Sequence, residues 1–127
     1  LHTRSASQAV DRVIDVFPAQ QQEQIRVLLA NTLEAVVAQR LLPRLGAPGR
    51  IPSVEVMIAS SAVRNLIREA KTHLLPGVIE TSAEMGMQTM DKALAELFMS
   101  GQISRQDALM HCADADNFER LVTGFSL

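Results

Sequence analysis

The stretch VVAQRLLPRLGAPGRIPSVEVMIA, residues 36 to 59, contains the strand signals of this chain. Its first part, residues 36–42, is apolar and rich in β-branched side chains, and residues 54–58 alternate Val and Ile with Glu55 and Met57. Between them, PRLGAPGR supplies the prolines and glycines of a turn. We predict a strand, a loop and a second strand that can pair as antiparallel neighbours. Two strands are too few for a stable free sheet, so we expect further strands to be missing from this chain.

The rest of the chain has helical spacing of apolar residues. Ser5, followed three residues later by Gln8, has the pattern of a capping box, and Ser104 with Asp107 repeats the serine cap. We also expect a last frayed turn to begin at Asp114 or Asp116. The helices that we predict cover 5–17, 19–35, 61–71, 74–86, 88–101 and a segment after Ser104. The fragment is therefore predicted to be mostly α-helical with one small strand pair.

Composition limits the class of protein. A chain of 127 residues with 47% hydrophobic and 20% charged residues is that of one ordinary globular domain. The single cysteine, Cys112, cannot form an internal disulfide, and no apolar run is long enough to span a membrane, so we expect a cytoplasmic protein. The net charge of −2 and the absence of Trp and Tyr argue against nucleic-acid binding. Because the chain begins at Leu1, we expect it to be a piece of a longer one.

The chain contains no complete catalytic site that we recognise. His2, His73, His111 and Cys112 lack the spacing of metal ligands, and Cys112 is better explained as a small buried hydrophobic residue than as a nucleophile. The pairs Asp11 with Asp15 and Asp114 with Asp116 are best interpreted as a solvated helix face and as caps. Met85, Met87 and Met90 are more typical of a core than of a binding surface. The phosphate-binding pattern G-x-x-x-x-G-K-[ST] is absent from the sequence.

A basic stripe on one predicted helix is less easily explained. Arg64, Arg68 and Lys71 occupy one side of the helix and Val63 the other. Like charges four residues apart cost a few tenths of a kcal/mol on an isolated helix, which suggests that an acidic partner or a phosphate meets them. A plain solvated face is the alternative, with Glu55 and Glu69 nearby.

The segment AVRNLIREAKTH closely resembles the A-I-R-N-L-I-R-E motif of the PilT-like type IV pilus retraction ATPases, the motors of twitching motility. Val63 in place of Ile is the one change within the motif, which covers Ala62, Val63, Arg64, Asn65, Leu66, Ile67, Arg68 and Glu69. Further matches follow in order along almost the whole chain, from LHTRSASQAVDRVIDVFP to GMQTMDKALAELFMSGQIS. The resemblance is to the retraction branch more than to pilus assembly or type II secretion ATPases.

The resemblance implies an α/β parent, a hexameric RecA-like P-loop ATPase of the secretion superfamily. Residues 1–127 would be the C-terminal half of its ATPase domain, with a PAS-like domain and the Walker A and Walker B segments upstream. His2 matches the histidine-box residue near the γ-phosphate. Arg4 departs from the family, which commonly has Asn there. The parent would bind ATP and Mg²⁺, whereas this fragment would bind neither and be inactive.

The implied partners are five further copies in a homohexamer and the pilus inner-membrane platform protein, with no nucleic acid and no direct membrane insertion. The motor would act in the cytoplasm, at the inner-membrane base of the pilus machine. Arg64 and Arg68 would make changing ion pairs with a neighbouring segment or subunit during retraction. We also expect the apolar faces of helices 5–17 and 19–35 to be exposed in the fragment, and the fragment to self-associate. A different interpretation is a self-standing helical interaction module that uses Arg64, Arg68 and Lys71.

Overall fold

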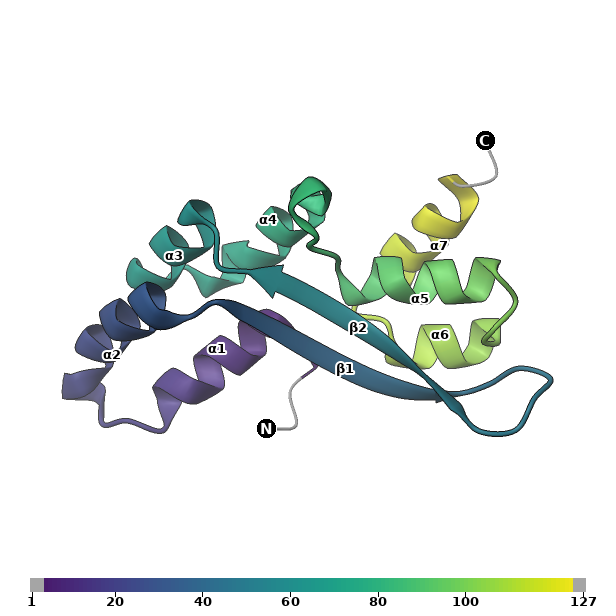
Figure 1. Cartoon of the computed structure of the whole chain (residues 1–127), viewed down its shortest axis with the longest axis horizontal. Coiled ribbons are helices and arrows are strands. Elements are labelled where there is room, and N and C mark those ends of the chain that lie inside the picture. The colour runs from purple at the N-terminus through teal and green to yellow at the C-terminus, as the bar shows by residue number, and fades with distance from the viewer. Residues whose placement is uncertain (1–3, 125–127) are drawn as a thin grey trace. The chain divides into compact units, whose positions relative to one another are not determined.

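The computed structural model describes residues 4–124 and contains seven α-helices and one pair of strands within that range (Figure 1). In chain order the elements are α1 (Ala6–Asp15), α2 (Ala19–Thr32), β1 (Ala35–Pro43), β2 (Arg50–Ile58), α3 (Ser61–Arg68), η1 (Thr72–Leu74), α4 (Leu75–Thr81), η2 (Ala83–Met85), α5 (Met90–Met99), α6 (Arg105–His111) and α7 (Ala115–Gly124). Two compact units result. Within the described residues, the first comprises 4–38 and 56–88, and the second comprises 39–55 and 89–124.

The strands β1 and β2 form a two-stranded hairpin, as the sequence predicts. The Arg44 N–H donates to the Gly49 carbonyl (3.1 Å) at the end of the hairpin. Gly46 and Gly49 both have positive φ, 74° and 91°, which a residue with a Cβ adopts only at a cost. The turn chemistry of PRLGAPGR therefore sets where the hairpin reverses.

The alternation along β2 is present, but its buried face contains the polar residues. Ser53, Glu55 and Met57 are buried, whereas Val54 and the other apolar residues of the opposite face are only half-buried. The reason is tertiary, because the Glu55 carboxylate accepts a hydrogen bond from the Met90 N–H at the start of α5, and Met57 belongs to the core of the first unit. Burial of the Ser53 hydroxyl leaves its Oγ without a hydrogen-bond partner among the described atoms.

The first unit has its own hydrophobic core. Ser5 caps α1 as predicted, its hydroxyl accepting from the Gln8 N–H (3.2 Å), while the Gln8 side chain accepts from the Arg4 N–H. The apolar face of α1 is almost fully buried, so the expectation that this face is exposed in the fragment is wrong. On α2 the same expectation holds in part, since Leu28 is 58% exposed. The fully buried members of this core are Ala6, Val10, Ile14, Ala30, Met57, Val63, Ile67, Leu75, Ile79 and Met87.

Two helices of the first unit are shorter than their apolar pattern suggests. α2 ends at Thr32, not at residue 35, because Leu33 already has the extended backbone that leads into β1. α3 ends at Arg68 rather than at Lys71. After it, Ala70 adopts a left-handed conformation with φ 59°. The Lys71 N–H then donates to the Leu66 carbonyl and the Ala70 N–H to the Ile67 carbonyl, which is the hydrogen-bond pattern of a Schellman cap.

The second unit packs α5, α6 and α7 around a separate core. Thr89 caps α5 and Ser104 caps α6, each accepting from the third residue of its helix. The expected frayed last turn is instead the ten-residue helix α7, which is capped by Asp114 and held by the fully buried Phe118. The buried members of this core are Leu42, Met90, Leu94, Ala95, Ile103, Ala108 and Phe118.

Of the methionines flanking Gly86, Met87 and Met90 are buried as predicted, whereas Met85 is 52% exposed. Within residues 4–124, none of the helices combines the length and the apolar character needed to cross a bilayer.

Candidate functional site

The segment Ala62–Glu69 forms most of α3 and its end. Ser60 begins the helix by accepting a hydrogen bond from the Val63 N–H (3.3 Å). Val63 and Ile67, four residues apart, are fully buried in the core of the first unit. Burial of this pair fixes the rotation of the helix about its axis, which leaves Arg64 and Arg68 on the sides not occupied by the core.

Arg64 binds the C-terminal end of α2. Its Nη1 donates to the main-chain carbonyl of Ala30, one of the last four carbonyls of that helix, which have no partner within the helix itself. A cation at this end also interacts favourably with the helix dipole. The Arg64 Nη2 lies 4.0 Å from the Glu34 carboxylate, whose side chain is 90% exposed, so this ion pair adds little.

Arg68 reaches the same end of α2 by a different route. Its Nη2 donates to Asn31 Oδ1 (3.0 Å), and its Nη1 donates to Asn65 Oδ1 (2.7 Å) on α3 itself. Asn65 therefore helps to orient the guanidinium toward α2. The repulsion between Arg64 and Arg68 is offset because both guanidinium groups hydrogen-bond to acceptors at the end of a neighbouring helix. We call this arrangement, Arg64 and Arg68 on residues 30–31 of α2, the arginine clamp.

Lys71 does not belong to this clamp, which corrects the three-residue basic stripe. It follows the end of α3, and its Nζ pairs with Glu69 Oε2 (3.3 Å). Both of these side chains are more than half exposed, so the pair contributes little to stability. The stripe is therefore a pair of arginines with structural partners and a separate exposed ion pair.

The clamp lies where three elements of the first unit meet. The Ala59 N–H donates to the Glu34 carbonyl (3.0 Å), which links the end of β2 to the residue that precedes β1. On the other side, Thr72 Oγ1 donates to Asp11 Oδ1 (2.7 Å), so the segment after α3 is tied to α1. Asp11 is thus a hydrogen-bond acceptor as well as part of a solvated helix face. A shift of α3 would have to break or exchange these contacts.

Two buried carboxylates of the second unit are absent from the sequence-based candidates. Asp91 is 4% exposed and accepts from the Ala113 N–H (2.7 Å) and from Asn117 Nδ2 (3.0 Å). Glu55 is 7% exposed and accepts from the Met90 N–H (3.1 Å) at the start of α5. For Asp91 the available signal was its place in the first turn of the helix predicted over 88–101. Glu55 lies on the predicted second strand and was expected beside the basic stripe, whereas its carboxylate meets the start of α5 instead. In both cases the bonding partners are distant in sequence. Both carboxylates make hydrogen bonds that tie α5 to neighbouring elements.

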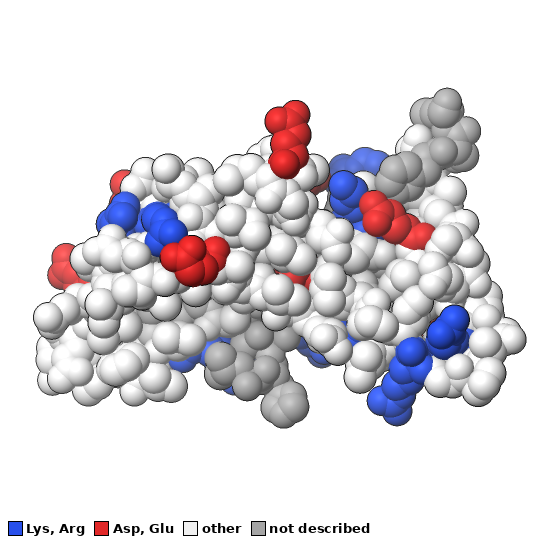
Figure 2. Space-filling model, viewed as in Figure 1, with Lys and Arg blue, Asp and Glu red and all other residues white. Residues whose placement is uncertain are grey.

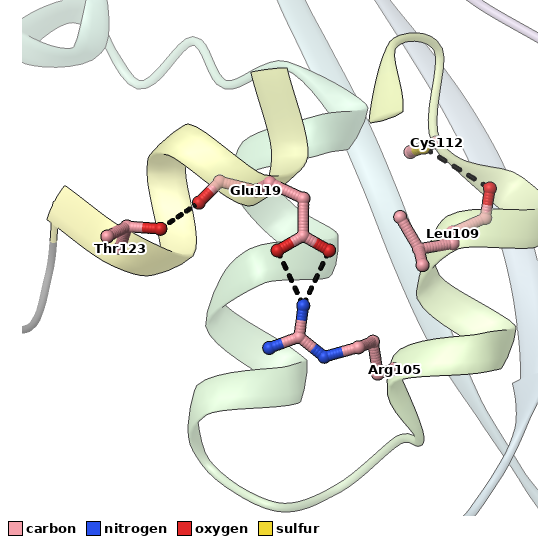
Figure 3. A network of polar contacts seen from close by, with 5 residues as sticks. All are labelled: Arg105, Leu109, Cys112, Glu119 and Thr123. Carbon is pink, nitrogen blue, oxygen red and sulfur yellow. Dashed lines mark hydrogen bonds and ion pairs between the residues drawn. The ribbon is translucent and has the colours of Figure 1, made fainter. Parts of the chain in front are cut away.

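Arg105 forms a second polar cluster, shown in Figure 3, in which its guanidinium donates to both carboxylate oxygens of Glu119 on α7. The same guanidinium lies 5.0 Å from the centroid of the Phe98 ring, a cation–π distance. Cys112, in the same view, is half-buried, and its thiol donates to the Leu109 carbonyl (3.3 Å). Burial, and next the negative charge of Asp91, raise the pKa of the Cys112 thiol, so the thiol is protonated at neutral pH and a poor nucleophile.

His2, the candidate histidine-box residue, lies outside the described residues. Among residues 4–124, no three His, Cys, Asp or Glu side chains come together in an arrangement that could hold a metal ion. Of the candidate sites, the arginine clamp is therefore the one whose side-chain contacts the structure describes.

Comparisons with known proteins find relatives with related functions. No family model matches the chain. The chain is 42% identical over 118 residues to the type IV pilus retraction ATPase PilT of Pseudomonas aeruginosa, a match that covers 93% of this chain and 34% of that protein. It is also 42% identical to a twitching motility protein of Neisseria gonorrhoeae, covering 92% of this chain and 31% of the relative. The chain thus spans about a third of the length of these relatives.

Solved structures agree with the sequence relatives. The crystal structure of the pilus retraction motor PilT with bound ADP matches 94% of this chain and 33% of that one, with a TM-score of 0.78 and 41% sequence identity. The ATPase DotB of Legionella pneumophila matches with a TM-score of 0.69 at 18% identity, which indicates a shared fold alone. The helices and the strand pair are therefore those of part of a RecA-like ATPase fold.

Proposed function

Because the chain belongs to the PilT-like type IV pilus retraction ATPases, we propose that it is the C-terminal half of the ATPase domain of a hexameric motor that drives pilus retraction and twitching motility. The Pseudomonas aeruginosa relative is an ATPase by name, and the matching structure of a pilus retraction motor contains ADP. In this proposal the parent hydrolyses ATP with Mg²⁺ in the cytoplasm, at the inner-membrane base of the pilus machine. Its partners are five further copies and the platform protein of the inner membrane.

The arginine clamp is the observation that supports a role in motion. Arg64 and Arg68 come from the A-x-R-N-L-I-R-E segment, and both hold the end of α2 next to the residue that leads into β1. Movement of α2 along its axis would remove the Ala30 carbonyl from Arg64 and would require a new acceptor. In this proposal the motif positions α3 against the end of α2. The clamp then transmits a nucleotide-dependent domain movement to the part of the motor that retracts the pilus.

The self-standing interaction module has less support. It needs Arg64, Arg68 and Lys71 to present a common basic surface to a partner. Arg64 is directed to Ala30 and Arg68 to Asn31, while Lys71 pairs with Glu69. A partner would have to displace these contacts first.

The described residues do not fit a nucleotide site by themselves. The chain has no G-x-x-x-x-G-K-[ST] sequence, so it lacks the lysine and the backbone amides that hold phosphates in such a loop. His2 would act near the γ-phosphate only when the remainder of the motor supplies that loop. We therefore derive no catalytic step from this chain alone.

The proposal is tested in the full-length parent with the double variant Arg64→Ala/Arg68→Ala. Since neither arginine is implied as a phosphate ligand, ATP hydrolysis and hexamer formation should remain close to those of the wild type, whereas twitching should be lost. The measurements are steady-state ATPase rate, hexamer content by light scattering and twitching-zone diameter. His2→Ala should instead lower the ATPase rate, by about 100-fold if it orients water or stabilises transition-state charge.

Lys71→Ala is the matched control, because it removes a positive charge from the same segment without touching α2. It should leave all three measurements unchanged. If the double arginine variant twitches normally, the clamp has no part in retraction. If Lys71→Ala abolishes twitching as well, the effect belongs to the charge of the segment and not to the clamp.

A further inference from the structure

The hairpin tip, residues 43–50, combines positive charge with an exposed apolar side chain. No Asp or Glu occurs between Ala35 and Val54, whereas Arg40, Arg44 and Arg50 all lie there. Figure 2 shows basic side chains near this end of the molecule, with no acidic side chain beside them on the visible face. Within the described residues, the guanidinium groups of Arg44 and Arg50 have neither an ion pair nor a hydrogen bond.

The geometry of the tip places the two arginines on either side of an uncharged loop. The Arg44 N–H donates to the Gly49 carbonyl (3.1 Å), so Arg44 lies across the hairpin from the residue that precedes Arg50. Gly46, Ala47, Pro48 and Gly49 form the end of the loop. Leu45 is 55% exposed, although its N–H is anchored to the Gln102 carbonyl (2.9 Å). The backbone is therefore fixed while the leucine side chain remains available.

We propose that the hairpin tip is a peripheral docking surface for an anionic phospholipid membrane, with Arg44 and Arg50 at the lipid phosphates and Leu45 among the headgroups. The proposed contact is with the membrane surface, and no part of the tip crosses the bilayer. It is independent of the proposed motor function, since it uses no residue of the arginine clamp.

The positive charge of the tip is complementary to an anionic surface. The exposure of the whole tip favours a membrane over an acidic protein as that surface. Arginines bind phosphate oxygens well, and an apolar residue between them can lie at the level of the headgroups. Every residue from Pro43 to Arg50 is exposed, so a broad surface can contact all of the tip at once. A flat, deformable, negatively charged surface accommodates such a tip.

The test is sedimentation of the full chain with vesicles containing phosphatidylglycerol and phosphatidylcholine, compared with vesicles of phosphatidylcholine alone. We expect binding to the anionic vesicles that weakens at high salt. Each arginine near an anionic surface contributes about five-fold in affinity, so Arg44→Ala/Arg50→Ala should lose on the order of 25-fold. Leu45→Ser should lose about ten-fold without any change in charge.

The matched control is Arg12→Ala/Arg26→Ala, which removes the same charge from α1 and α2. It should bind anionic vesicles as the wild type does, and circular dichroism should show that all variants are folded. Equal losses in both double variants would overturn the proposal, because net charge alone would then explain binding. Absence of wild-type binding to anionic vesicles, including a case in which the chain binds a polyglutamate peptide instead, would also overturn it. Unchanged binding of Leu45→Ser would overturn the contact with the headgroups.

Discussion

At the scale of single residues, local chemistry and tertiary context assign different roles to similar side chains. Arg64 and Arg68 are hydrogen-bonded to α2, whereas Arg44 and Arg50 carry the same charge without a partner among the described residues. A guanidinium that satisfies the end of a helix stabilises the fold, while one that is solvated does not. Ala70 is a further local exception, because it occupies a left-handed conformation that favours glycine.

Replacing Ala70 with Gly should stabilise the chain by about 0.5–1 kcal/mol, since the steric cost of a Cβ at φ 59° exceeds the entropy that glycine loses on folding. The midpoint of urea unfolding measures this, provided that the slope of the transition is unchanged. Ala62→Gly, an exposed position within α3, is the control and should destabilise by about 0.5–1 kcal/mol. A destabilised Ala70→Gly variant would show that the backbone at this position carries no strain.

At the scale of elements, helix α5 is held at its N-terminal end by two buried carboxylates. Asp91 connects it to the segment before α7 and to Asn117 on α7, and Glu55 connects β2 to its first N–H. Negative charge at this end is also favourable for the helix dipole. These contacts join elements that are neighbours in space and distant in sequence.

Asp91→Asn should weaken the attachment of α7 to α5 by about 1–3 kcal/mol, because an Asn side chain has one acceptor oxygen for the two donors, the Ala113 N–H and Asn117 Nδ2, and its NH2 group would face the other donor. Hydrogen–deuterium exchange should show faster exchange of α7 amides, with little change in α3 of the first unit. Asp116→Asn makes the same chemical change at an exposed position of α7 and should change the exchange little.

The exchange of both side chains, Asp91→Asn with Asn117→Asp, restores one donor facing one acceptor. The double variant should therefore recover part of the stability lost in Asp91→Asn, which a double-mutant cycle measures. If the double variant is less stable than the sum of the two single variants predicts, the Asp91–Asn117 hydrogen bond is not what holds α7.

At the scale of the whole molecule, each of the two compact units has its own core, and neither carries a phosphate-binding loop. Large apolar side chains remain exposed on β1 and α2, including Leu41 at 49% and Val27 at 43%. Exposed apolar surface of this kind is typical of regions that pack against other parts of a protein or against another copy.

The 127-residue chain alone should neither bind nor hydrolyse ATP appreciably, because one histidine cannot replace the amides and the lysine that hold the β- and γ-phosphates. Isothermal titration calorimetry with Mg²⁺ and ATP measures this, with the full-length parent as the positive control. Micromolar affinity for the chain alone would contradict the prediction and would place a nucleotide site within these residues.

The sequence by itself determined the features that depend on neighbouring residues. The serine caps at Ser5 and Ser104, the turn glycines and the hydrophobic spacing predicted the hairpin and the positions of most helices, because the groups involved lie within a few residues of one another. The relationship to the retraction ATPases was likewise present in the order of residues in Ala62–Glu69.

Only the tertiary structure decided which groups these elements meet. The acceptors of Arg64 and Arg68 lie 34 and 37 positions away along the chain, and Asp91 is bound by residues 22 and 26 positions away. Likewise, Glu55 is buried on β2 whereas Val54 is only half-buried, and the Glu55 carboxylate accepts from the Met90 N–H, 35 positions away. Alternating hydrophobicity indicates that a strand has two faces, but long-range packing decides which face is buried.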